Sequence, residues 1–121
     1  MRFEDWKNEN SIVRVCRELL DNTDLDYSFV DSPLSLELLF YVVGSDIKVR
    51  FNCKEISKLS IEKENEDLPL HLVLETNVWE KNEDFHIQIF PEFALNIVCK
   101  RFDWQIEEFS EKERSEVYSL A

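Results

Sequence analysis

Two histidines are the first candidates for chemistry. His71 and His86 lie in different segments of alternating apolar residues, and Glu75 follows His71 by four positions. Imidazoles and a carboxylate are common zinc ligands. No ligand spacing of the HExxH kind accompanies them. The pattern therefore favours half-exposed strand residues over a metal centre, and we predict no metal and no other cofactor.

The three cysteines are a second candidate set. Cys16, Cys53 and Cys99 are odd in number, widely spaced and free of any CxxC pair, which favours reduced thiols in a cytoplasm. The alternation of apolar residues places Cys53 and Cys99 on an apolar face, where a thiol behaves as a small hydrophobic group. We therefore predict no catalytic cysteine.

A third pattern combines carboxylates with a lysine. Asp31, followed by Asp46-Ile47-Lys48, imitates the D…(D/E)xK arrangement of metal-dependent nucleases, in which two carboxylates hold Mg²⁺ and a lysine assists the attacking water. Asp46, however, directly follows a predicted turn, where a polar residue is expected in any case. A metal-dependent hydrolase therefore stays as an alternative function.

The glycine content excludes one class of enzyme. Gly44 is the single glycine among 121 residues. Walker-type loops and dinucleotide-binding fingerprints need several glycines, because backbone N–H groups must approach the phosphates closely. Nucleotide sites built on those loops are therefore excluded.

The charge balance indicates the kind of partner. The chain carries 14 basic and 26 acidic residues, a net charge of −12. Such a field repels nucleic acids and anionic membranes and attracts basic proteins, although acidic surfaces also simply keep small proteins soluble. No apolar run is long enough to span a bilayer, and the N-terminal "MRFEDWKNEN" is charged where a secretory signal is apolar. We expect a cytoplasmic protein with a basic protein partner.

The segment "NVWEKNEDF" (77–85) is the best candidate for binding. We expect it to be a loop between two strands, with Trp79 among the acidic residues Glu80, Glu83 and Asp84. An aromatic anchor inside a charged rim is typical of a binding hot spot. The alternative is a tryptophan that folds back over the edge of the sheet. A secondary acidic rim in "EKENED" is expected if both loops lie at one end of the sheet; its residues are Glu62, Glu64, Glu66 and Asp67.

These candidates need a scaffold, which begins with a helix and a hairpin. The spacing of apolar residues in "IVRVCRELL" predicts an amphipathic helix over about 11–21, with Ser11 or Asn10 as N-cap. From residue 34 the period is two. A two-residue type II′ turn at Gly44-Ser45 pairs Phe40 with Val49, and every other pair on that face of the hairpin (34–53) is apolar as well.

Further strands follow the hairpin. We expect a short strand at 56–62, one at 70–76, and a pair formed by 85–90 and the residues after Pro91, in which Ile87 faces Ile97. A bulge near Lys100-Arg101 is needed to keep the later apolar residues on one side. Ser110 three positions before Glu113 predicts a short C-terminal helix. The whole chain, 1–121, reads as one α+β domain with an antiparallel sheet of about six strands.

Two stretches resemble small bacterial immunity proteins, the cytosolic antidotes of polymorphic or contact-dependent inhibition toxins. The stretches are "DSPLSLELLFYVVGSDIKVRFNCKEISKLSIE" (31–62) and "FHIQIF…LNIVCKRFDWQIEE" (85–108). The resemblance is one of overall pattern: an Asp-Ser before a long hairpin, alternating strands and an "I-x-C…W-x-I-E" ending. It implies an inhibitor that binds one toxin domain, often a nuclease, and masks its active site.

The sequence thus favours a non-enzymatic binding protein that neutralises a cationic, nuclease-type toxin domain through an acidic surface. A basic nucleic-acid cleft is the natural complement of such a surface, and electrostatic steering accelerates the encounter. A structural or adaptor subunit is the alternative from another class, including a homodimer that pairs through a sheet edge or through Leu39 and Tyr41.

Overall fold

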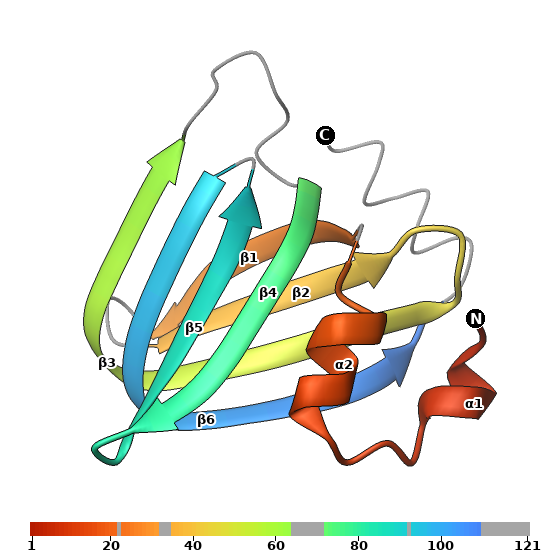
Figure 1. Cartoon of the computed structure of the whole chain (residues 1–121), viewed down its shortest axis with the longest axis horizontal. Helices are drawn as coiled ribbons and strands as arrows, with labels where there is room; N and C mark the ends of the chain where they lie inside the picture. Colours follow the sequence, from red (N-terminus) through yellow and green to blue (C-terminus); the bar gives the residue numbers. More distant parts are fainter. Residues whose placement is uncertain (22, 32–34, 64–71, 92, 110–121) are drawn as a thin grey trace.

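A single antiparallel sheet of six strands makes up most of the molecule (Figure 1). The computed structural model describes residues 1–21, 23–31, 35–63, 72–91 and 93–109. In chain order the elements are α1 (Phe3–Trp6), α2 (Ile12–Glu18), β1 (Thr23–Asp31), β2 (Ser35–Val42), β3 (Ile47–Lys63), β4 (Leu72–Lys81), β5 (Asp84–Pro91) and β6 (Phe93–Glu108). The strand order is β1-β2-β3-β6-β5-β4. The sheet curls until its two outer strands meet in one short ladder, Thr23 with Val73 and Asp24 with Leu72.

The α+β class is confirmed in its broad form, with helices smaller than expected. The predicted helix over 11–21 is α2, which has only seven residues and ends at Glu18. Ser11 is its N-cap, as expected, and its Oγ accepts a hydrogen bond from the Arg14 N–H. The predicted C-terminal helix lies outside the described residues. No helix in the described ranges is long and apolar enough to cross a membrane.

The register of the predicted hairpin is confirmed, but its turn is not the one expected. Phe40 pairs with Val49 and Leu36 with Cys53. The strands are joined by four residues rather than two. A hydrogen bond from the Ser45 N–H to the Val42 carbonyl places Gly44, with φ of 76°, at the third position of the turn. The register survives because the longer loop is centred on the same residues.

This four-residue loop also holds both ends of the described chain. The Asp46 carboxylate accepts a hydrogen bond of 2.8 Å from the Phe3 N–H. The Asp46 carbonyl accepts one of 2.9 Å from the Phe109 N–H, and the Ser45 hydroxyl donates to the Met1 carbonyl. The polar side chains of the loop therefore have a structural use, as hydrogen-bond partners for distant backbone groups.

The predicted strand at 56–62 is part of β3 and not a separate element. β3 runs for 17 residues beside β6, which has 16. Glu55 takes a positive φ of 53°, and the register with β6 shifts between Ile56 and Lys58. Such irregularities bend a strand and increase its twist. They let one long strand follow the curl of the sheet.

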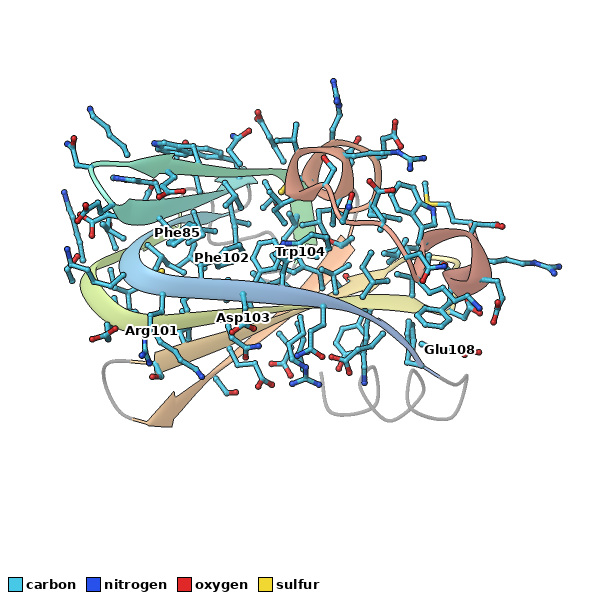
Figure 2. All side chains as sticks on the ribbon, turned by 90° about the horizontal axis from the view of Figure 1, so that it is seen from below. Phe85, Arg101, Phe102, Asp103, Trp104 and Glu108 are labelled. Atoms are coloured by element: carbon cyan, nitrogen blue, oxygen red, sulfur yellow. The ribbon has the colours of Figure 1, made fainter. Side chains whose placement is uncertain are left out.

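β6 changes the face that it turns inward, as the sequence predicted. Before the change Ile97 and Cys99 are buried, and after it Phe102 and Trp104 pack against the core. Figure 2 shows Phe102 and Trp104 pointing into the interior, while Arg101 and Asp103 point away from it. The register shift lies on the neighbouring β3, between Ile56 and Lys58, and not at Lys100-Arg101 as expected.

β1 was not predicted. Its sequence, "TDLDYSFVD", begins just after the range 11–21 that was expected to be helical. It pairs with β2 along most of its length, with Leu25 opposite Phe40. Polar and apolar residues alternate at Asp24, Leu25 and Asp26, which is the pattern of a strand with one buried face. In the structure Leu25 is buried and Asp26 is exposed.

The interior of the curled sheet is apolar, and the two helices close it. The rings of Phe40 and Phe51 meet at 4.8 Å between centroids. α2 contributes Val15 and Cys16, and the turn after it contributes Leu19 and Leu20. Packing of these side chains against the inward face of the strands explains why so short a helix is stable, since isolated helices of this length are not.

The outer face of β2, β3 and β6 carries a charged cluster centred on Arg50. Its guanidinium forms ion pairs with Glu37 of β2 and, at 2.6 Å, with Glu107 of β6. Lys48 lies 3.9 Å from the same Glu107 carboxylate. The hydrogen bond from Arg50 is the main cause that lowers the pKa of Glu107. The Arg50 side chain of β3 thus links β3 to both of its neighbours, β2 and β6.

Gly44→Ala tests the turn. A Cβ at this position meets no atom within 4 Å, so the cost comes from the positive φ alone, about 1 kcal/mol or slightly more. We expect that loss in the free energy of unfolding measured by urea denaturation. Val43→Ala in the same loop is the control and is expected to change stability by less than about 0.5 kcal/mol. Equal stability of the Gly44 variant and wild type would contradict the assigned conformation.

Glu107→Gln tests the Arg50 cluster through pH. Because the folded-state pKa of Glu107 lies below its ordinary value of 4.5, the ionised carboxylate stabilises the fold above that pH and the benefit disappears as pH falls through the folded-state pKa. Wild type is expected to exceed the variant by about 0.5–1 kcal/mol at pH 7, with the difference closing below pH 4.5. Denaturation curves from pH 3 to 7 measure it. If the stability difference between wild type and the variant did not change with pH, the ionised Glu107 carboxylate would not be its cause.

Candidate binding site around Trp79

The segment 77–85 is a strand, a turn and a strand, not the loop that the sequence suggested. Trp79 and Glu80 lie within β4, Asp84 begins β5, and Lys81 pairs with Asp84 across a two-residue turn. Both turn residues, Asn82 and Glu83, have positive φ, as a type I′ turn requires. The hairpin was missed because its turn contains no glycine and because Trp79, on its outer face, breaks the alternation of apolar and polar residues.

Trp79 lies on the outer surface of this hairpin. The inward-facing neighbour Val78 packs against the core, so alternation turns Trp79 outward. Its indole is 39% exposed and stacks on the imidazole of His86 from β5, with 5.1 Å between ring centroids and 9° between planes. The two rings form a flat aromatic platform, a large rigid contact surface of the kind found in hot spots.

Polar side chains border this platform on the neighbouring strands. In one cross-strand row Trp79, His86, Val98 and Lys58 follow one another. The adjacent row consists of Asn77, Gln88, Asn96 and Ser60. Residues of both rows line a shallow hollow of about 290 Å³. The surface therefore offers amide and hydroxyl groups beside the aromatic plate.

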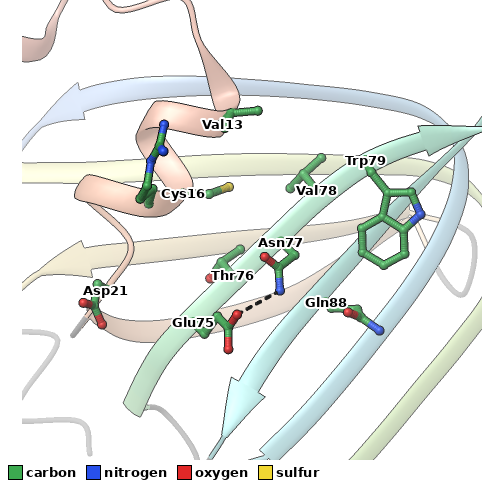
Figure 3. A pocket seen from close by; sticks show the side chains of 10 residues that line it. Val13, Cys16, Asp21, Glu75, Thr76, Asn77, Val78, Trp79 and Gln88 are labelled. Carbon is green, nitrogen blue, oxygen red and sulfur yellow. Dashed lines mark hydrogen bonds between the residues drawn. The ribbon is translucent and has the colours of Figure 1, made fainter.

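A larger groove of about 580 Å³ lies between α2 and β4. Five consecutive residues of β4, 75–79, form one wall, and Val13, Cys16 and Arg17 of α2 form the other. Figure 3 shows Val13 at the helix side and Trp79 at the opposite side, with Val78 between them. Trp79 lines both hollows and stands as a ridge between them.

The groove contains both charge signs and one unusual polar group. Arg17 faces it from α2, and Asp21 and Glu75 contribute carboxylates. The Asn77 amide donates a hydrogen bond of 3.4 Å to Glu75 (Figure 3). Thr76 is only 4% exposed, and its hydroxyl has no hydrogen-bond partner within the described structure. Most buried hydroxyls are paired, so an unpaired one at the edge of a groove is unusual.

The acidic residues predicted to surround Trp79 do not all lie beside it. Glu80 is the next residue of β4 and therefore projects to the other side of the strand. Glu83 is exposed in the turn. Asp84 forms an ion pair of 3.1 Å with Lys100, which raises the pKa of that lysine. The primary rim is thus a strip at the β4–β5 turn, partly neutralised at Asp84.

Glu62, the one described member of the predicted secondary rim, does not lie beside the primary rim. Glu62 lies opposite Ala94 near the start of β6, whereas Asp84 is next to Phe85, which lies opposite Cys99. These positions are at different ends of the β5–β6 ladder. The other predicted members, Glu64, Glu66 and Asp67, lie outside the described residues.

The remaining candidates for chemistry have other surroundings. His71 lies outside the described residues, and His86 stacks on Trp79. Asp46 accepts the Phe3 N–H. Cys53 and Cys99 are fully buried, and a hydrogen bond between their thiols, with burial, raises the pKa of Cys53. In the part of the chain that the structure describes, no three His, Cys, Asp or Glu side chains are grouped to hold a metal ion.

Two parts of the site were missed in the sequence for different reasons. The stacking of His86 on Trp79 follows from the hairpin register, which the period-two pattern of 72–81 and 84–91 contains. The approach of α2 to β4 joins residues some 60 positions apart, and no local pattern encodes it. The apolar spacing of "IVRVCRELL" put Val13 on the face expected to pack against the sheet, whereas in the structure Val13 is 60% exposed at the groove.

Cysteine labelling tests the burial of the groove wall. Burial raises the pKa of Cys16 to about 12, and all three cysteines are buried. We expect native protein at pH 8 to react with iodoacetamide far more slowly than protein in urea at all three thiols, because the reagent cannot reach a buried sulfur. At Cys16 the raised pKa also leaves little of the thiolate, which is the reacting form. Peptide mass mapping of labelled sites measures this. Rapid alkylation of Cys16 in the native state would show that the groove opens more widely than described.

The chain was compared with known proteins. No family model and no curated protein matches it. A solved structure that it resembles is described as an uncharacterized protein from Neisseria gonorrhoeae, with a TM-score of 0.56 and 18% sequence identity. The match covers 69% of this chain and 90% of the other. At this level of identity the similarity is one of fold, and the curled antiparallel sheet is therefore found in at least one other protein.

Proposed function

We propose that this protein is a non-enzymatic binding protein of the immunity type, which acts in the cytoplasm and neutralises a cationic toxin domain, of the nuclease class, by occupying its active-site cleft. The partner contacts the surface formed by Trp79, the β4–β5 turn and the groove beside α2. The resemblance of the two sequence stretches to immunity proteins suggests the class, and the surface supplies the physical support.

The observation that carries this proposal is the position of the exposed apolar side chains. In the described part of the chain four large hydrophobic residues are strongly exposed: Met1, Val13, Val43 and Trp79. Two of them, Val13 at 60% and Trp79 at 39%, line the same groove. Apolar side chains left in water around one hollow mark an interaction surface more often than isolated ones do.

The net charge supports a basic partner. A chain at −12 attracts a cationic domain over a distance of about a Debye length and accelerates its association. Glu80 and Glu83 are exposed and carry no ion pair within the described residues, so their charge is available. Asp84 shares its charge with Lys100 and contributes less. We assign anchoring to Trp79 and steering to the acidic turn.

Co-expression tests the proposal. The products of the genes adjacent to this one are expressed singly and together with it. We expect one neighbour to arrest growth when expressed alone, to carry a basic domain, and to be harmless in the presence of this protein. If no neighbour is toxic, or if toxicity persists when the two chains are co-expressed, the immunity function is wrong.

Two variants then locate the surface on the purified complex. Trp79→Ala is expected to weaken the equilibrium affinity about 30-fold, the loss of roughly 2 kcal/mol typical of an aromatic hot spot. Glu80→Lys with Glu83→Lys is expected to slow association about tenfold or more, with a smaller effect on dissociation. Asp26→Lys with Glu108→Lys is the charge-matched control at other exposed sites. Equal slowing by both pairs would assign the effect to net charge and not to this surface.

A further inference from the structure

The geometry points to strand addition at the edge of β4: we propose that an extended, basic segment of the protein partner lies in the groove beside α2 and pairs its backbone with the residues 75–79. This inference rests on the proposed function and adds the mode of recognition. Main-chain pairing at a sheet edge provides affinity, and the pockets for alternate side chains provide specificity.

The edge is open because the sheet closes over only a short distance. Among the described residues, β1 pairs with β4 at Val73 and Leu72 and at no later residue of β4. From Glu75 to Lys81 the strand pairs with β5 on its other side. No backbone hydrogen bond between described residues joins this part of β4 to α2. An edge of this kind presents unpaired N–H and C=O groups, which are a template for another strand.

α2 leaves space beside this edge and does not satisfy it. A helix bonds its own backbone groups, as the Leu19 N–H does with the Val15 carbonyl, so it offers β4 side chains only. The space between the two elements is about 580 Å³, within the range of clefts that hold ligands. All five residues from 75 to 79 line it, which is the length of a short added strand.

Thr76 provides independent support for an occupant. Thr76 is only 4% exposed, and its hydroxyl has no hydrogen-bond partner among the described residues. The residue lines the groove on the β4 side (Figure 3). A hydroxyl withdrawn from water and left unpaired is costly. Because less than 1 Å² of this oxygen is exposed, an added segment would supply the missing hydrogen bond once the Thr76 side chain rotates toward the groove.

The side chains around the groove select a basic segment. Every second residue of β4 faces the same side of the strand, and along the groove these residues are Glu75, Asn77 and Trp79. An arginine or lysine in the added strand would pair with Glu75 and lie against the exposed indole of Trp79, where a cation is attracted to the ring. Asp21 adds a second carboxylate. Arg17 has no ion pair among the described residues and suits the carbonyl oxygens of an extended chain.

Synthetic hexapeptides test this proposal on the full-length protein. The probe is an acetylated and amidated peptide of alternating valine and arginine. One comparison peptide replaces arginine by glutamate, and another is N-methylated at every second residue, which removes the donors needed for strand pairing. Chemical-shift changes in ¹H–¹⁵N spectra and amide hydrogen exchange are measured. We expect the basic peptide to shift the resonances of residues 75–79 and to slow exchange there about tenfold or more, and both comparison peptides to fail.

A matched pair of variants separates the groove from general charge effects. Val13→Arg places a cation on the helix wall of the groove, and Val43→Arg makes the same change at the exposed β2–β3 loop. Both side chains are exposed, so both variants should fold. We expect Val13→Arg to weaken binding of the basic peptide about tenfold and Val43→Arg to leave it within about twofold of wild type. Equal weakening of peptide binding by both variants would contradict the placement of the peptide in the groove.

Other outcomes distinguish this inference from the proposed function. Equal binding of the N-methylated peptide, or no protection of residues 75–79 at millimolar peptide, overturns strand addition. Protection of the same amides without peptide, in a dimer seen by analytical ultracentrifugation, assigns the edge to a second copy and overturns the basic partner. If a neighbouring toxin is neutralised through Trp79 while exchange at 75–79 stays unchanged in the complex, strand addition fails and the immunity function stands.

Discussion

The pairing of β3 with β6 is the interaction on which the rest of the molecule depends. These strands are 17 and 16 residues long, and each belongs to both halves of the curled sheet. The first half of β3, beside the second half of β6, carries β2 and the Arg50 cluster. The first half of β6, beside the second half of β3, carries β5 and the aromatic platform. The irregularities at Glu55 and between Ile56 and Lys58 turn one half against the other. Without that bend the sheet would be flat and would enclose no core.

The same curvature explains why a groove exists. A sheet bent mainly along one pair of strands brings its outer strands together at one end only, so β1 and β4 meet at Thr23 and Val73 and then part. α2 fills the interior side of the gap with Val15 and Cys16. The helix is too short to follow β4 to its end. Stability therefore requires the helix at one end of the gap, and the other end is left open to a partner.

Much of the fold is readable in the sequence where two signals agree. Between 35 and 53 the alternation of apolar residues and the single glycine define the same centre, so the register was correct although the turn type was wrong. Between 77 and 85 the signals disagree, because Trp79 faces outward and Asn82-Glu83 replaces the usual glycine-containing turn. The candidate site was therefore predicted around Trp79 but with the wrong local structure. Its second wall, α2, depends on tertiary packing that overrides local preference.

The ties between the β2–β3 loop and both chain ends have a consequence for folding during synthesis. Asp46 bonds the backbones of Phe3 and Phe109, and β6, the last described strand, pairs with the centrally placed β3. Contacts between residues so far apart in sequence close slowly, since the loop entropy must be overcome first. A nascent chain therefore holds β3 paired on its β2 side only, and an incomplete core, until residues near 108 have left the ribosome. The sheet is completed only after β6 has emerged, however early the first hairpin forms.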